Sequence, residues 1–198
     1  MNSVLVTGSN RGLGLEWVRQ YAAAGWRVYA TCRFPDRAAD LQRLKSENPN
    51  VSVHRLDVTE PDQVRQMAVQ LGDSPLDVLI NNAGVYKERW GKDQLGRIDY
   101  AIWFDTFAVN TLGTMRVSEA LTDSLALSER RLLVAISSHM GSIADISAPN
   151  DYAYRSSKAA LNAAMKGISL DLARRGIGVL ILHPGWVRTR MGGDRAPL

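Results

Sequence analysis

The chain has 198 residues, of which 45% are hydrophobic and 22% charged, and this suits one domain, residues 1–198, with a sizeable core. The net charge of +4 could attract phosphate, but the arginines are scattered and lack the interleaved aromatic residues that stack on bases, so we expect no nucleic-acid partner. The single cysteine, Cys32, excludes an internal disulfide framework, and no apolar run or leader-like start is present, so we expect a cytoplasmic protein that binds no membrane.

Short β-rich runs alternate with longer segments of helical period along the chain. Residues 85–98 have no clean period and are expected to form a loop. The other segments predict strands at 3–7, 27–31, 51–56, 77–80, 131–137 and 178–182, and helices at 13–24, 37–47, 61–71, 100–127 and 151–174. This order predicts an α/β fold, a doubly wound Rossmann-type parallel sheet of about six strands with helices on both faces.

The residues that could carry chemistry each follow a predicted strand. In a doubly wound sheet, ligands bind outside the carboxyl ends of the strands, at the point where the strand order reverses. The segments that immediately follow strands are 7–14, Asp57, 81–84, Ser137 with Ser138, and Pro184 with Gly185. We therefore expect one site at this edge of the sheet.

A glycine-rich loop, TGSNRGLG, joins the first predicted strand to the first helix. Gly8, Gly12 and Gly14 allow a tight turn and a close approach of the backbone to a pyrophosphate at the helix N-terminus. A plain glycine turn is the alternative, but the strand before it and the helix after it favour a phosphate-binding loop.

Tyr154 and Lys158 lie four residues apart on a predicted helix, so both project from one face. A phenol is a poor acid or base at neutral pH unless a nearby cation favours its phenolate form, and Lys158 can be that cation. Tyr152 has Ser156 four positions later and is not the candidate. Ser138 can donate a hydrogen bond to a substrate oxygen, with Ser137 and Ser142 as alternatives.

The glycine spacing G-x-x-x-G-x-G, together with Asn-Asn-Ala-Gly at 81–84, resembles the short-chain dehydrogenase/reductase family. The resemblance implies that Tyr154 exchanges a proton with the substrate, that Lys158 activates it and binds the nicotinamide ribose, and that Ser138 is the catalytic serine. It also implies that Asn110 holds a water that links Lys158 to solvent; the alternative is a capped or water-bonded kink in the helix. Asp57 would touch the adenine, or it is an ordinary helix cap.

The family resemblance extends the cofactor site to several further residues, which we expect to line it: Asn10, Arg11, Leu13, Val58, Asn82, Ala83, Gly84, Pro184, Gly185, Val187 and Thr189. In PGWVRT, the Val187 backbone and the Thr189 hydroxyl would meet the nicotinamide carboxamide, although a plain turn could look the same. His139 and His183 flank the site, but with His54 distant we expect no metal site.

Cofactor choice depends on the end of the second predicted strand. An NAD site places an acid about 20 positions after the glycines, whereas a 2′-phosphate calls for arginine. Cys32 stands where the acid would be and Arg33 follows it, with Arg11 in the glycine loop and Asp36 as a possible acid. The pattern favours NADP(H), with NAD(H) as the alternative.

Within the family, NNAGVY, YAYRSSKAALN and HPGWVRT are similar to the carbonyl reductase branch that includes Sniffer proteins and the bacterial C-factor. We expect an NADPH-dependent reductase of a small aldehyde or ketone, or in the reverse direction a dehydrogenase of an alcohol, assembled as a homodimer or homotetramer. The alternatives are a nucleotide-binding signalling protein of the C-factor type and an NAD-linked alcohol dehydrogenase. Family members usually continue for tens of residues through a seventh strand, so we expect that the substrate-covering segment is truncated.

Overall fold

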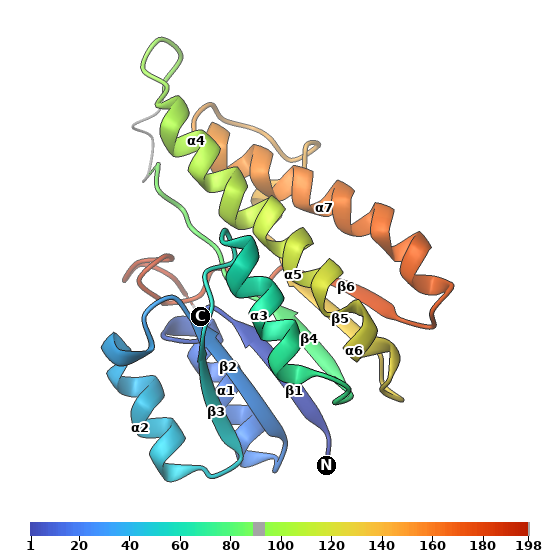
Figure 1. Ribbon diagram of the computed structural model, residues 1–198. Coiled ribbons are helices and arrows are strands. Elements are labelled where there is room, and N and C mark those ends of the chain that lie inside the picture. Colours follow the sequence, from blue (N-terminus) through green and yellow to red (C-terminus); the bar gives the residue numbers. More distant parts are fainter. Residues whose placement is uncertain (89–93, 198) are drawn as a thin grey trace.

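The computed structural model describes residues 1–88 and 94–197 and contains a six-stranded parallel sheet (Figure 1). Its strands, in the order β3-β2-β1-β4-β5-β6, are β1 (Ser3–Thr7), β2 (Arg27–Cys32), β3 (Val51–Arg55), β4 (Val78–Asn81), β5 (Leu132–Ile136) and β6 (Gly178–Leu182). Neighbouring strands pair in parallel throughout. The predicted doubly wound sheet is confirmed, and the strand order reverses between β1 and β4.

Helices cover both faces of the sheet and form two separate cores. Alternation along β1 shows the two faces, because Leu5 belongs to one core and Val4 and Val6 to the other. One face carries α1 (Gly12–Ala23) and α2 (Ala39–Glu47). The opposite face carries α3 (Pro61–Leu71), α5 (Thr114–Ala120), α6 (Thr122–Ala126) and α7 (Tyr152–Ala173), with α4 (Tyr100–Phe107) beside α7 (Figure 1).

The helix expected over residues 100–127 is not continuous. Between α4 and α5 the chain forms a π-helix at Ala108–Gly113, and at Leu121 the backbone leaves helical geometry before α6. The first interruption has a tertiary partner, because Asn110 of the π-helix hydrogen-bonds both backbone groups of the distant Val85. The prediction of one long helix was wrong because periodicity does not report such contacts.

The remaining predicted elements agree with the structure to within two residues. A 3₁₀ turn at Pro35–Arg37 precedes α2, because Ala38 adopts a non-helical conformation. The expected loop at 85–98 falls partly on residues 89–93, which lie outside the described residues.

Strand β6 lies at one edge of the sheet, and its Leu180 and Ile181 are exposed. In the described ranges, none of the helices has the length and apolar character to cross a bilayer.

Candidate active site

The glycine loop between β1 and α1 forms a cradle that larger residues would block. Gly8 and Gly12 have φ of +68° and +55°, in the left-handed region that favours glycine. A Cβ added to Gly14 would lie 2.3 Å from the carbonyl oxygen of Gly8. Helix α1 has no side-chain cap and no acidic residue in its first turn, so its positive end is open to an anion.

Asn82 and Thr7 hold this loop against the end of β4. The Thr7 hydroxyl accepts hydrogen bonds from the backbone N–H groups of Asn82 and Ala83, both at 3.0 Å. The side-chain amide of Asn82 donates to the carbonyl oxygens of Thr7 and Gly8, at 2.9 and 3.1 Å. Asn82 therefore shapes the cradle from behind. Thr7 belongs to the predicted loop segment 7–14, but its part in holding the turn after β4 was not predicted from the sequence.

Ser138, Tyr154 and Lys158 come together at the carboxyl end of β5. Ser138 follows the strand, and its hydroxyl accepts from the Met140 N–H at 3.1 Å and lies close enough to the Tyr154 phenol to lower the pKa of that group. Tyr154 and Lys158 project inward from the first two turns of α7 and are 8% and 4% exposed. The Lys158 ammonium donates to the carbonyl oxygen of Ile136 at 2.8 Å and lies 5.8 Å from the centre of the Tyr154 ring.

Burial shifts the pKa values of Tyr154 and Lys158 in opposite directions. It raises the pKa of Tyr154, and the hydrogen bond with Ser138 lowers it in part. Burial also lowers the pKa of Lys158 to about 8. The expected effect of Lys158 on the phenolate stays a prediction: the Lys158 ammonium donates to the Ile136 carbonyl and lies beside the Tyr154 ring. A buried phenol that stays protonated at neutral pH can donate a proton.

The two alternative serines lie elsewhere. The Ser137 hydroxyl donates to the side-chain oxygen of Asn162 at 2.6 Å, so it fastens β5 to α7. Ser142 lines a separate pocket that is described below. Of the three serines, Ser138 is the one placed against Tyr154.

Asn110 lies at the centre of the π-helix and is fully buried. Its side-chain amide donates to the Val85 carbonyl at 2.9 Å and to the Ser157 hydroxyl at 3.0 Å, while its oxygen accepts from the Val85 N–H at 2.8 Å. The same oxygen lies beside Gly84, where an added Cβ would be 3.4 Å from it and 3.8 Å from the Lys158 ammonium. Asn110 thus joins the turn after β4 to the helix that carries Tyr154.

Positive charge gathers beside the glycine loop. Burial lowers the pKa of Arg11, and the nearby charges of Arg190 and Arg33 lower it further. Arg33 and Arg37 flank the ring of Phe34, with guanidinium carbons 5.9 and 5.4 Å from its centre. Arg190 was not among the predicted cofactor residues, although Val187 and Thr189 of the same segment were.

Asp57 and Val58, which we expected to line the cofactor site, are held by contacts with Thr59 and with the π-helix. The Asp57 carboxylate accepts from the Thr59 N–H at 3.0 Å and from the Thr59 hydroxyl at 2.8 Å. The N-cap residue of α3 is Glu60, so the alternative that Asp57 is a helix cap was wrong. Val58 is buried and packs on the π-helix, since a Cβ on Gly113 would meet its side chain at 2.6 Å.

The segment after β6 folds back over the glycine loop. Gly185 has a φ of +82°, and after Pro184 and Val187 the chain reaches Thr189, whose methyl group would contact a Cβ on Gly12 at 3.4 Å. The Thr189 hydroxyl accepts from the Gly192 N–H at 3.1 Å. The contact between Thr189 and Gly12 brings the residues adjoining them, Arg190 and Arg11, close together.

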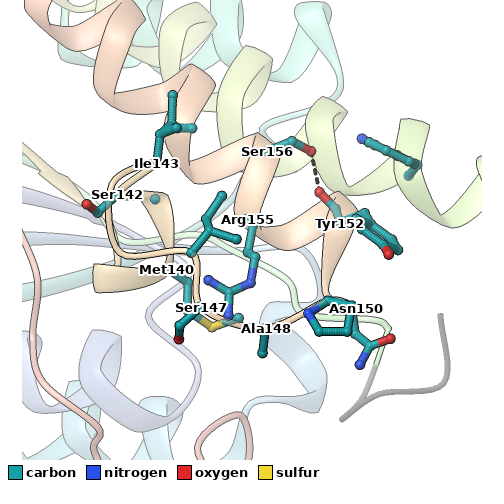
Figure 2. A pocket seen from close by; sticks show the side chains of 14 residues that line it. Met140, Ser142, Ile143, Ser147, Ala148, Asn150, Tyr152, Arg155 and Ser156 are labelled. Carbon is teal, nitrogen blue, oxygen red and sulfur yellow. Dashed lines mark hydrogen bonds between the residues drawn. The ribbon is translucent and has the colours of Figure 1, made fainter. Parts of the chain in front are cut away.

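A pocket of about 640 Å³ lies close to Ser138, Tyr154 and Lys158, the catalytic cluster, but on another face of α7 (Figure 2). Among the described residues, its lining includes Tyr152, Arg155, Ser156 and Ala159 of α7 and the loop from Met140 to Asn150, but neither Tyr154 nor Lys158. Helical geometry places Tyr152 and Ser156 on the side of α7 away from Tyr154, whereas Arg155 lies on the face between that side and Lys158. In Figure 2, Arg155 extends from the helix toward this loop. The pocket thus adjoins the turns of α7 that carry Tyr154 and Lys158 without being lined by either side chain.

The fold and this cluster define an oxidoreductase of the Rossmann type. The family model described as short chain dehydrogenase matches residues 2–197, and the chain belongs to this family. The C-signal protein of Myxococcus xanthus is 44% identical over 135 residues, which cover 68% of this chain and 80% of that protein.

Two solved structures have the same fold and related sequences. The NADPH-bound carbonyl reductase from chicken fatty liver is 35% identical, with a TM-score of 0.90 over 98% of this chain and 83% of that one. The carbonyl reductase Sniffer of D. melanogaster is 32% identical, with a TM-score of 0.92 over 100% of this chain and 86% of that one. The predicted family and its carbonyl reductase branch are thereby confirmed.

Proposed function

We propose that the chain is an NADPH-dependent reductase of aldehydes or ketones. The observation that carries this proposal is the juxtaposition of Ser138, the buried Tyr154 phenol and the buried Lys158 ammonium at the edge of the sheet where the glycine loop lies. The glycine cradle and the open first turn of α1 fit a dinucleotide pyrophosphate. Bound there, the reduced nicotinamide supplies a hydride to the carbonyl carbon.

The protein residues have separate parts in this proposal. Ser138 donates a hydrogen bond to the substrate oxygen, which gains negative charge in the transition state. Tyr154 delivers a proton to that oxygen, and Lys158, one turn along α7, stabilises the phenolate that results. Asn110 keeps the turn at Gly84 in place next to Lys158. A water at its remaining acceptor position would connect Lys158 to solvent.

The preference for NADP(H) over NAD(H) rests on the arginines. Arg11, Arg33 and Arg190 lie close enough for their charges to interact, and such a group is unfavourable until an anion joins it. A 2′-phosphate on the adenine ribose offers that anion. The chicken carbonyl reductase, which is similar over nearly the whole chain, binds NADPH, and this supports the choice.

The experiment that tests the proposal is a titration of the chain with NADPH and with NADH, followed by turnover with a panel of aldehydes and ketones. We expect tighter binding of NADPH and carbonyl-dependent oxidation of the cofactor. Turnover with NADH alone would replace the NADP(H) assignment by an NAD-linked dehydrogenase.

A second candidate is a signalling protein that binds the nucleotide without turnover. The similarity to C-signal favours it. The Ser138, Tyr154 and Lys158 arrangement supports catalysis, because a binding protein needs no buried proton donor beside a serine hydroxyl. Binding of NADPH with no turnover of any carbonyl would decide for the second candidate.

A further inference from the structure

The helix that carries Tyr154 begins without a cap of its own. Asn150 and Asp151, which precede α7, both have left-handed backbones, with φ of +82° and +58°. In this conformation the side chain of Asp151, the N-cap residue, makes no capping hydrogen bond. The first backbone N–H groups of a helix have no partner inside the helix, so those of α7 need one from elsewhere.

Glu88 is that partner. Its two carboxylate oxygens accept hydrogen bonds from the N–H groups of Ala153 and Tyr154, each at 2.5 Å. Glu88 is 4% exposed, and in the ranges 1–88 and 94–197 it is the only buried carboxylate. A buried charge is costly unless donors compensate it, and here two amides and the positive end of the α7 dipole do so.

Glu88 belongs to a short loop, residues 86–88, that also contacts the side chains around Tyr154. The Tyr86 hydroxyl hydrogen-bonds the carboxylate of Asp151, and the rings of Tyr86 and Tyr154 lie 4.7 Å apart. Residues 86–88 thus hold Tyr154 through its amide and through its ring. They begin two positions after Gly84, so the turn beside the glycine cradle and the catalytic helix are linked over a few residues.

We propose that Glu88 is a positioning residue for catalysis, which holds the Tyr154 phenol in register with Ser138 by binding the Tyr154 amide. The inference rests on the proposed reductase function. A phenol displaced by about 1 Å from its reacting position can lose on the order of a hundredfold in rate. Binding of the cofactor's pyrophosphate does not depend on this contact, because the cradle is built from residues of the first loop and of the turn after β4.

The test variant is Glu88→Gln, which keeps the size of the side chain but offers an acceptor to only one of the two amides. We expect kcat for carbonyl reduction to fall about 10- to 100-fold while the Kd for NADPH stays within about twofold of wild type. In Glu88→Ala, kcat should fall further than in Glu88→Gln, with the same Kd for NADPH. Amide hydrogen exchange should become faster at residues 152–158 and not in the sheet.

Asp99→Ala is the matched control. Asp99 caps α4 by accepting from the Ile102 N–H at 3.1 Å, and it is exposed and outside the cluster. Loss of this cap should leave kcat within about twofold of wild type. A kcat of Glu88→Gln equal to that of the control, a parallel loss of NADPH affinity, or unchanged exchange at 152–158 would each overturn the inference. Absence of turnover in the wild-type chain would overturn the proposed function instead, and the exchange measurement would then decide on the cap alone.

Discussion

The side chain of Asn110 pairs with both backbone groups of Val85. Its oxygen accepts from the Val85 N–H at 2.8 Å, and its nitrogen donates to the Val85 carbonyl at 2.9 Å. The pair resembles the two hydrogen bonds that neighbouring strands exchange, but it joins a π-helix to a turn. The irregular helix is thereby tied to the loop that leads from the glycine cradle to Glu88.

Replacement of Asn110 by leucine should destabilise the fold. The variant leaves the N–H and the carbonyl of Val85 without their side-chain partner, at about 1–3 kcal/mol for each unsatisfied buried group. We expect the free energy of unfolding, measured with urea, to fall by about 2–4 kcal/mol. Leu112→Ala, at an exposed position of the same π-helix, is the control. A change in Asn110→Leu no larger than in this control would contradict the prediction.

Removal of the Tyr154 hydroxyl should nearly abolish turnover. Tyr154→Phe retains the buried ring but loses the proton donor, and we expect kcat to fall by at least about 10²-fold with little change in the Kd for NADPH. Steady-state kinetics and a cofactor titration measure the two quantities. Tyr152→Phe, on the opposite face of α7, should behave as wild type. Unchanged turnover in Tyr154→Phe would contradict the assignment.

Lys158 should take up a proton when the cofactor binds near pH 8. Burial lowers its pKa to about 8, so about half of the chains hold a neutral Lys158 at this pH. An anionic dinucleotide beside it favours the charged form and raises the pKa, which gives an uptake of up to about half a proton at pH 8 and almost none at pH 6. Calorimetry in two buffers of different ionisation enthalpy measures this uptake. Lys158→Met should show none, and its absence in wild type at pH 8 would refute the prediction.

Arg33 and Arg190 should determine the discrimination between the two nicotinamide cofactors. Arg33→Asp should shift preference from NADPH toward NADH, because the new carboxylate repels the 2′-phosphate and can accept from a ribose hydroxyl. Arg190→Gln should weaken NADPH binding about tenfold, equivalent to ~1.4 kcal/mol. NADH binding is the internal control and should change little in Arg190→Gln. An equal loss for both cofactors would show that Arg190 contacts a part that they share.

Gly14 should not tolerate a side chain. The Cβ of Gly14→Ala would approach the Gly8 carbonyl oxygen to 2.3 Å, and such overpacking costs about 1–3 kcal/mol or more. We expect a lower Tm and a loss of NADPH binding. The matched control is Gly167→Ala, because Gly167 lies within α7 with nothing near its added Cβ, and this change should stabilise by about 0.5–1 kcal/mol. A stable Gly14→Ala variant with normal binding would contradict the close packing of the loop.

Much of the fold could be predicted because its signals are local. The run Ser3–Thr7 is apolar and short, and the glycines follow it directly, so strand, loop and helix were all predicted from neighbouring residues. The spacing of Tyr154 and Lys158 likewise required only the helical period. The long helix over 100–127 failed because its interruption at Asn110 depends on Val85, 25 positions away.

By itself, the sequence determined the parallel sheet, the edge of the sheet at which the site lies and the residue types there, because strand ends and helical faces follow from short-range periodicity. Only the tertiary structure decided which serine meets Tyr154, what caps its helix and which arginine joins Arg11 beside the glycine loop. The physical reason is that each of these is a contact between segments far apart in the chain. Glu88 and Tyr154, 66 positions apart, meet because α7 starts with an unpaired amide that only a distant carboxylate reaches.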